Sequence, residues 1–599
     1  MEFLDYYRDN LTYLRNLSAE FAVEFPKIAG RLGLGEFECE DPYIERLLEG
    51  TAFLSARVEK KLDESYASLL ESILNSVAPN ALYPIPSGAV LELTLNPANE
   101  QVRSGTTLPA GTVLDAFIPT INSPCRFSTL EDTHLSPLAV TETEYITRSL
   151  ADFGINNPQG LAGLRIKLSS SAALSSFAGR LNFYINLAEA DASLLLRQLM
   201  HETVGLYIRS GEDGKFVPLS GASLDMPLAS GLKLLPGRIK GHVLGLRVLQ
   251  NFLAYPAFFK FFSLENLQGA FAPSTNTAEL LLVFKRREPS LVSVKGSSLK
   301  LNCVPAVNLF AKRSDRVMIE KEAYQFHVVP DRAAPRDYEV VHIQRLEFFN
   351  EQNETLFFAE NFYEDNPLAE KTRKNFFSQQ RRKTLVNSLN ARRSSYDGAE
   401  VFVSFSAQDR KIEEAYQFAA DTICTNRDLA LLLLPETSLN SRSPLLSGAV
   451  FISRPTRPEY SLFYRQGTSD FSKLSHIVFN LSALLWQNGK FPLEALRTLL
   501  GSYQVHSREE TERMLEGLIS LESKSAAFRF IRKGAVFFEL GWKVSFTLDE
   551  TAYAGMGYYT FGKIVAEVLK SFAPVNTILE IHFLTKQSGR IAIWKTLED

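Results

Sequence analysis

The spacing of apolar residues changes at the segment ALYPIPS, residues 81–87. Before this segment, apolar residues recur every three or four positions, which is the period of an amphipathic helix. After it, Leu91, Leu93 and Leu95 alternate with polar residues, which is the period of a strand. Two prolines within the segment favour an extended connector and exclude a helix. The chain is therefore expected to combine a helical part with a β-rich part, and the first boundary lies here.

Two long amphipathic helices are predicted before this connector. The first is indicated by an apolar stripe, and Pro26 disturbs its end. The stripe comprises Leu4, Tyr7, Leu11, Leu14, Leu17, Phe21 and Phe25. The second has a strong start signal, because Asp41 can cap the free N–H groups of a helix and Pro42 suits its first position. Its apolar stripe comprises Ile44, Leu47, Leu48, Thr51, Leu54, Val58 and Leu62. A third helix is predicted over 68–77, before Pro79.

These apolar stripes have two interpretations. The helices can pack on one another as an ordinary subdomain, or part of each stripe can be left for partner helices. On the second interpretation the candidate protein-interaction residues are Leu4, Tyr7, Leu11, Leu14, Ile44, Leu47, Leu48, Leu54 and Val58.

Length and composition limit the possible function. A chain of 599 residues is too long for one core and suggests several domains. With 64 basic and 68 acidic residues, it lacks the basic footprint of a nucleic-acid binder. We expect neither a secretory signal nor a membrane-spanning helix. The four cysteines are too dispersed for a zinc or redox motif, which favours a reducing cytosol.

The expected fold class is multidomain α+β, with an N-terminal helical segment, β-rich middle domains and a C-terminal α+β domain. Residues 243–262 are rich in aromatic side chains, and strand, helix and buried loop all remain possible there. The C-terminal part is predicted to hold helices over 474–486, 493–503, 509–520 and 558–572, with strands over 535–548, 577–584 and 591–595. The expected domains are 1–87, 88–240, 241–445 and 446–599.

No catalytic or cofactor motif is complete. His201-Glu202 would begin a zinc-protease motif, but the second histidine is replaced by Gly205. The sequence around Ser223 fails as a nucleophile elbow because Asp225 stands where glycine is required. Gly555-Met556-Gly557 precedes a predicted helix but lacks the remaining residues of a phosphate loop. We therefore predict no catalytic residue, no cofactor and no metal site.

A basic tract occupies residues 371–393. It holds eight Lys or Arg residues and no acidic one: Lys371, Arg373, Lys374, Arg381, Arg382, Lys383, Arg392 and Arg393. A solvated loop or helix face would explain it. The alternative is a docking patch for an acidic protein surface, with Arg381, Arg382 and Lys383 as its candidate contacts.

Several phrases, in order along the chain, resemble the TssF family, also called VasA or ImpG. They are YYRDNLTYLRNLSAEFAVEFPKIAGRLGL, DPYIERLLEGTAFLSARVEKKLDE, LNCVPAVNLF, VVPDR and CTNRDL. Arg454-Pro455-Thr456 and the Asp549-Glu550 pair before Gly555-Met556-Gly557 agree with the family as well. Leu540-Gly541 departs from it, since family members commonly carry Arg-Gly there. Asn251 also stands where an acid is usual.

The resemblance implies a structural subunit of the type VI secretion baseplate and not an enzyme. Two TssF copies would join one TssG, and TssK and TssE would complete wedges around the VgrG hub, which nucleate the contractile tail. Sheath and membrane-complex contacts would follow, on the cytoplasmic side of the inner membrane, without nucleic acid and without direct membrane insertion. The alternative function is a β-rich hydrolase or a carbohydrate-binding protein.

Overall fold

In a computed structural model, the chain forms two compact units. One comprises residues 1–83 and 460–479, and the other comprises residues 84–459 and 480–599. We call the first the helical unit and the second the main unit. The structure describes residues 3–33, 41–77, 79–103, 105–148, 150–155, 157–170, 179–211, 214–229, 244–271, 275–320, 322–363, 375–384, 393–407, 410–435, 437–461, 492–503, 508–532, 535–573 and 577–596.

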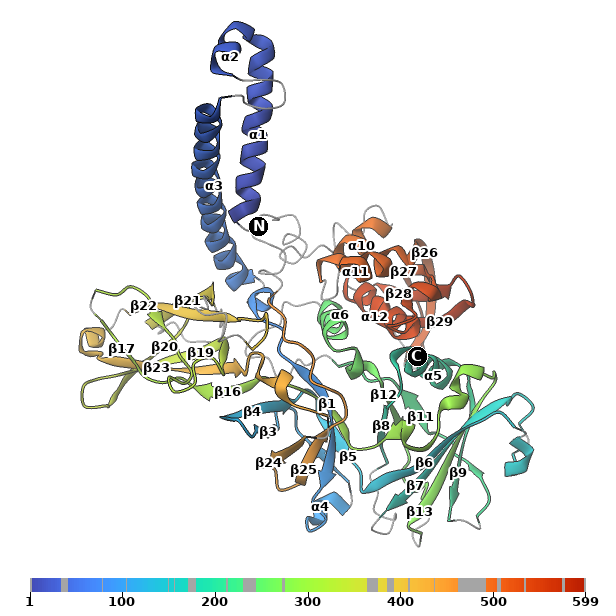
Figure 1. The fold of residues 1–599 in the computed structure, drawn as a ribbon. Coiled ribbons are helices and arrows are strands. Elements are labelled where there is room, and N and C mark those ends of the chain that lie inside the picture. The colour runs from blue at the N-terminus through green and yellow to red at the C-terminus, as the bar shows by residue number, and fades with distance from the viewer. Residues whose placement is uncertain are drawn as a thin grey trace. The chain divides into compact units, whose positions relative to one another are not determined.

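The helical unit contains α1 (Phe3–Glu24), α2 (Pro26–Leu32), α3 (Pro42–Val77) and a short 3-10 turn, η1 (Pro79–Leu82). Helices α1 and α3 lie side by side (Figure 1). The first two predicted helices are confirmed. The separate helix predicted over 68–77 is wrong, because α3 runs for 36 residues without a break. No glycine or proline interrupts the sequence from residue 51 to 77, so nothing ends the helix before Pro79.

Small residues and polar pairs fix the contact between α1 and α3. Ala52 and Ala56 are completely buried, which lets the two helices approach closely. Asn10 donates a hydrogen bond to Glu59 (2.6 Å), and Arg15 pairs with Glu45 nearer the start of α3. These pairs join α1 to α3 at two well-separated positions.

The main unit begins with a closed barrel of six strands. In barrel order they are β1 (Gly88–Leu95), β15 (Cys303–Val307), β4 (Ile121–Thr129), β3 (Val113–Ile118), β24 (Ser438–Ser441) and β25 (Leu446–Phe451). Leu91, Phe127 and Val304 are among the buried side chains of its core. The barrel includes strands from both sides of the domain boundaries expected at 240 and 445. Closing a barrel requires every strand to pair on both edges, and here the pairing strands lie far apart in sequence.

Two antiparallel sheets and two helices form the next part of the main unit. The larger sheet has the order β10 (Val217–Pro218), β9 (Thr203–Ser210), β13 (Thr277–Phe284), β7 (Ala162–Ser170) and β6 (Leu138–Ile146). The smaller has the order β11 (Ser223–Asp225), β12 (Phe261–Glu265), β8 (Leu181–Ile185) and β14 (Leu299–Lys300). The helices are α5 (Glu189–His201) and α6 (Leu244–Ala254). A short helix, α4 (Glu100–Arg103), and the pair β2 (Thr106–Leu108) and β5 (Thr133–Leu135) complete it.

An eight-stranded sheet follows, with a core rich in phenylalanine. Its order is β16 (Phe310–Arg313), β23 (Gln417–Thr425), β19 (Glu339–Phe349), β20 (Thr355–Asn361), β21 (Asn375–Lys383), β22 (Ala399–Ala407) and β18 (Phe326–His327), with β17 (Val317–Met318) also paired to β23. The rings of Phe348 and Phe357 stack with centroids 4.6 Å apart.

The C-terminal sheet has the order β26 (Leu518–Arg532), β27 (Ala535–Leu548), β28 (Ile578–Thr585) and β29 (Gly589–Lys595). Its helices are α10 (Leu493–Ser502), α11 (Arg508–Glu516) and α12 (Tyr558–Ser571). The predicted helices over 493–503 and 558–572 and the three predicted strands are confirmed. The helix predicted over 509–520 ends at Glu516, because β26 begins at Leu518. The helix predicted over 474–486 lies outside the described residues.

The chain is thus a multidomain α+β protein, as predicted. Residues 243–262, for which three alternatives were open, contain helix α6, a 3-10 turn at Pro256–Phe259 and the start of β12. Among the described helices, none combines the length and the apolar composition needed to cross a membrane.

Candidate protein-interaction surfaces

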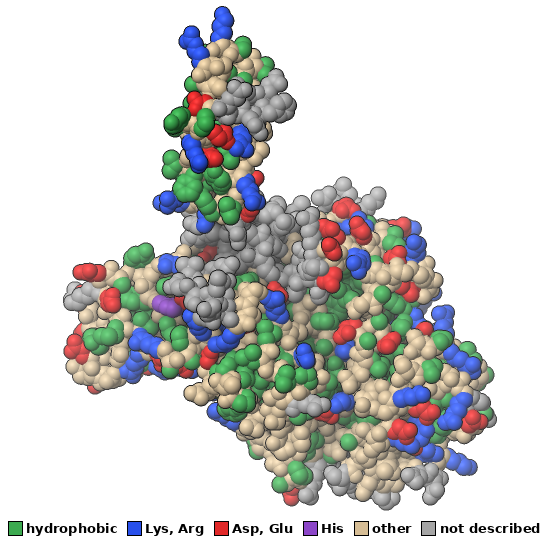
Figure 2. Space-filling model, viewed as in Figure 1, with side chains coloured by type: hydrophobic (Ala, Val, Ile, Leu, Met, Phe, Trp, Pro, Cys, Tyr) green, Lys and Arg blue, Asp and Glu red, His purple; other side chains and the backbone are tan. Residues whose placement is uncertain are grey.

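Helix α3 has two apolar faces, and among its described side chains one face is buried and the other is largely exposed. The face toward α1 carries the buried Ala52 and Ala56. On the other face Leu47, Leu54 and Val58 are 65%, 64% and 60% exposed, and Leu62 and Leu69 are also more than half exposed. These positions recur at helical spacing, so they form one continuous stripe, which we call the α3 stripe. Figure 2 shows hydrophobic side chains along this side of the helical unit.

The start of α3 follows the predicted local chemistry. The Asp41 side chain accepts a hydrogen bond from the Tyr43 N–H (2.9 Å), and the Asp41 carbonyl accepts one from the Glu45 N–H (3.0 Å). Pro42 occupies the first turn, where no donor is required. The cap therefore fixes where α3 begins.

The predicted interaction residues divide into two groups. Leu4, Leu47, Leu54 and Val58 are exposed, whereas Tyr7, Leu11, Leu14, Ile44 and Leu48 are half-buried. The half-buried group lies partly within the helical unit and offers less surface to a partner. Sequence reasoning missed Tyr13, Tyr43 and Leu69, which are exposed as well. Continuing the helical spacing of Leu47, Leu54 and Leu62 would have found Leu69.

The basic tract separates into residues with different surroundings. Arg381 is only 3% exposed, and its guanidinium donates to the carbonyls of Val340 (3.0 Å) and Val341. The expectation that Arg381 offers its charge to a partner is therefore wrong, because the group is used inside the protein. Arg382 is exposed and lies 4.4 Å from the centre of the Phe402 ring. Lys383 is the last residue of β21, and its side chain lies outside the described parts of the structure.

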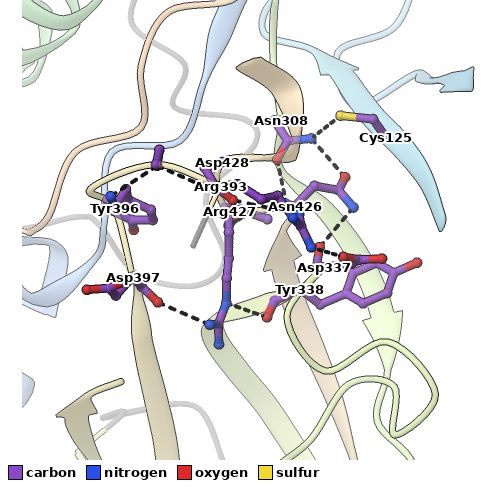
Figure 3. A network of polar contacts seen from close by, with 12 residues as sticks. Cys125, Asn308, Asp337, Tyr338, Arg393, Tyr396, Asp397, Asn426, Arg427 and Asp428 are labelled. Carbon is purple, nitrogen blue, oxygen red and sulfur yellow. Dashed lines mark hydrogen bonds and ion pairs between the residues drawn. The ribbon is translucent and has the colours of Figure 1, made fainter. Parts of the chain in front are cut away.

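Two phrases that support the family resemblance meet in a buried polar network (Figure 3). Asn308, from LNCVPAVNLF, donates to the Arg126 carbonyl (2.6 Å) and to Asn426 Oδ1 (2.9 Å). Asn426, from CTNRDL, donates through Nδ2 to the carbonyls of Pro124 and Asp337, both at 3.2 Å. Both asparagines are completely buried. The network joins the barrel to the eight-stranded sheet, so the asparagines position two sheets and do not form a surface.

Arg427 and Glu339 extend this network. Arg427 donates to the Tyr338 carbonyl (2.8 Å) and to the Asp397 carbonyl (3.1 Å). Glu339 accepts hydrogen bonds from the Tyr396 hydroxyl (2.7 Å) and from the Ala399 N–H (2.8 Å). Complete burial raises the pKa of Glu339, although Arg427 and these hydrogen bonds oppose the effect. These charges are therefore held by the fold and are not exposed to solvent.

The incomplete catalytic motifs have structural roles or lie at the surface. Burial lowers the pKa of His201 to about 4, and its ring nitrogen lies 2.9 Å from the Tyr559 hydroxyl. Ser223 lies on the short strand β11, paired with Glu265. Gly557 has a φ of 85°, and a side chain there would meet Ser193, whose hydroxyl accepts from the first N–H groups of α12. Within the described residues, no three His, Cys, Asp or Glu side chains are placed to hold a metal ion.

A second exposed apolar strip lies on β27 and was not predicted. Phe538 and Leu540 are 74% and 78% exposed, next to Val536 on the same face of the strand. Further along β27, Val544 and Phe546 continue this face and are completely buried. Alternation in the sequence predicts the strand. It does not show at which residue the apolar face of β27 changes from buried to exposed.

The whole chain has a counterpart among known protein families. A family model described as type VI secretion system, TssF matches residues 1–598. The chain belongs to the TssF family. The type VI secretion system component TssF1 of Pseudomonas aeruginosa is 30% identical to it over 619 residues, covering 99% of this chain and 98% of that protein.

A solved structure has the same fold as this TssF-family chain. The structure is described as the type VI secretion system TssK-TssF-TssG baseplate subcomplex, determined by cryo-electron microscopy. One of its chains aligns with a TM-score of 0.70 at 20% identity, covering 93% of this chain and 98% of that chain. Family membership favours the structural interpretation over a hydrolase or a carbohydrate-binding protein.

Proposed function

We propose that this protein is a non-enzymatic wedge subunit of the type VI secretion baseplate that joins TssG, and through it TssK, by means of the α3 stripe. The observation that carries the proposal is the exposed row of Leu47, Leu54, Val58, Leu62 and Leu69. Burying a leucine or valine stabilises an association by about 1.5–3 kcal/mol. Several such residues on one helix face are enough to make a subunit depend on its partner.

A helical partner fits this stripe better than a strand or a loop. Successive exposed leucines and the valine of α3 lie four or seven positions apart, which is the spacing that an opposing amphipathic helix meets. TssG and a second copy of this chain, two copies to one TssG, are the partners that the family resemblance implies. We therefore propose that the helical unit makes the contacts with TssG and with the second copy of this chain in the wedge.

The remaining contacts are assigned by the family resemblance. TssE and the VgrG hub would complete the wedge ring, which nucleates the contractile tail beside the cytoplasmic face of the inner membrane, with sheath and membrane-complex contacts. Arg382 and Lys383 are the members of the basic tract that remain candidates for docking to an acidic surface. Arg382 is supported by its exposure and by its position over Phe402.

Co-expression with TssG and TssK tests the proposal. The expected result is a protein that is heterogeneous when purified alone and that elutes as one stable complex with its partners. Size-exclusion chromatography with light scattering would show this directly, and electron microscopy would identify the subunits in the complex. A stable monomer that does not bind TssG would contradict the proposal.

A further inference from the structure

The chain crosses between the helical unit and the main unit at three places, and two of these crossings, 83/84 and 459/460, lie within the described residues. On the main-unit side, the segments next to these crossings are paired. Ile85 and Glu459 form an antiparallel bridge, in which each N–H donates to the other carbonyl at 2.9 Å. The two segments thus leave the main unit together.

This bridge continues the pairing of two barrel strands. In the barrel, Leu91 of β1 lies opposite Phe451 of β25. Beyond it, the Ile452 N–H donates to the Val90 carbonyl (3.0 Å), and the Thr456 N–H donates to the Gly88 carbonyl (2.9 Å). The ladder therefore runs from the barrel to Ile85 and Glu459.

Two hydroxyl groups maintain this ladder where the chain contains prolines. Pro455 and Pro458 have no N–H to donate. The Ser453 hydroxyl accepts from the Val90 N–H, and the Thr456 hydroxyl accepts from the Gly88 N–H, both at 3.0 Å. These side chains belong to the phrase that contains Arg454-Pro455-Thr456, which the proposed function does not explain.

Aromatic residues hold the other side of the paired segments. The Tyr255 hydroxyl donates to the Pro86 carbonyl, and its ring stacks on Phe258 with centroids 4.7 Å apart. A side chain added at Gly88 would lie 2.6 Å from the Tyr255 ring and 2.9 Å from the Phe258 ring. Glycine is needed at position 88 because the rings lie directly against its backbone.

We infer that Ser453 and Thr456 latch segment 452–459 to segment 84–90, so that the two segments form one closed neck that opens only as a unit. The neck would transmit a displacement of the helical unit to β1 and β25 together, and not to one strand alone. This inference concerns the chain itself and does not depend on which partner binds the α3 stripe.

Hydrogen exchange of the purified full chain tests the latch in a Ser453→Ala/Thr456→Val variant. The informative amides are those of Ile85 and Glu459, because neither donates to the two hydroxyls. If the neck opens as a unit, both should exchange at least about tenfold faster. The matched control is Ser447→Ala/Thr437→Val, which removes two hydroxyls that donate to carbonyls at the exposed surface of the same barrel.

A disulfide provides the second arm of this experiment. Opposed residues that exchange two backbone hydrogen bonds lie close enough for a disulfide, so Ile85→Cys/Glu459→Cys should cross-link. Adding it to the latch-deleted variant should restore slow exchange along both segments. If exchange increases only at Gly88 and Val90 and not at Ile85 and Glu459, the hydroxyls act locally and the inference is overturned. A cross-link that does not form would also overturn the inference, because Ile85 and Glu459 would then not be held opposite each other.

Discussion

Asn308 and Asn426 hold each other by two hydrogen bonds although 118 positions separate them in sequence. Asn308 Nδ2 donates to Asn426 Oδ1 at 2.9 Å, and the Asn426 N–H donates to Asn308 Oδ1 at 2.6 Å. Asn308 follows barrel strand β15, and Asn426 follows β23 of the eight-stranded sheet. This pair brings together two phrases, LNCVPAVNLF and CTNRDL, that are far apart in the sequence.

Replacing Asn308 with alanine should destabilise the junction of these two sheets. The Asn308→Ala change leaves the Arg126 carbonyl and the Asn426 N–H buried without their partner, at a cost of about 2–4 kcal/mol. Hydrogen exchange measures this destabilisation, and we expect the amides of β15 and β23 to exchange faster in the variant. Gln159→Ala, at an exposed loop, is the control and should have little effect. Because the two side chains share their bonds, Asn308→Ala and Asn426→Ala should be less than additive.

Glu339 should make stability depend on pH. Its folded-state pKa is raised by burial, so the folded protein binds the proton more tightly than the unfolded chain does. Stability should therefore fall as pH rises from the unfolded pKa through the higher folded pKa. Glu339→Gln cannot titrate at this position, so the variant should not show this loss. The unfolding free energy of the variant relative to that of the wild type should therefore rise over that pH window and then level off. Urea unfolding at a series of pH values measures it, and a constant difference at every pH would contradict the assignment.

Arg381 and Arg382 are adjacent but should respond differently to the same substitution. Arg381→Met removes the donors to the Val340 and Val341 carbonyls and should cost about 2–4 kcal/mol. Arg382→Met removes an exposed group and should change the unfolding free energy by about 0.5 kcal/mol or less. Thermal unfolding of the two variants makes the comparison. Equal effects would show that the guanidinium of Arg381 is not held as described.

Gly541 should not tolerate a side chain, because β28 runs directly beside it. A Cβ at this position would lie 2.0 Å from the Ile578 carbonyl oxygen. Gly541→Ala should therefore separate the start of the β27–β28 pair and destabilise the C-terminal sheet by about 1–3 kcal/mol. Gly555→Ala is a matched control, since nothing lies within 4 Å of a side chain there. Hydrogen exchange in β28 would distinguish the two variants.

Local chemistry predicted most of the regular elements. The cap at Asp41 and the apolar period predicted α3, and the alternation of Leu91, Leu93 and Leu95 predicted a strand where β1 lies. The 36-residue length of α3 was missed because two apolar patterns were interpreted as two helices. Helix and strand periods act over a few residues, so they report local structure well.

Features that depend on distant segments could not be predicted in this way. The barrel pairs β1 with β15 and β25, and no local pattern contains that information. Arg381 and Arg382 have the same chemistry in sequence, yet only Arg381 reaches the Val340 and Val341 carbonyls. Likewise, the sequence predicted most residues of the α3 stripe, but it did not show that the face of α3 toward α1 is the one with the buried Ala52 and Ala56.

Binding of TssG by a Leu47→Gln/Leu54→Gln/Val58→Gln variant tests the central claim most directly. These side chains are already exposed, so the variant should keep the helicity and unfolding temperature of the wild type. The control is Leu161→Gln/Leu434→Gln/Met318→Gln, which changes three exposed apolar residues of the main unit. We predict at least about a hundredfold loss of TssG affinity for the α3 variant and none for the control, from the burial of about three apolar side chains. Unchanged binding of TssG by the folded α3 variant would contradict the account.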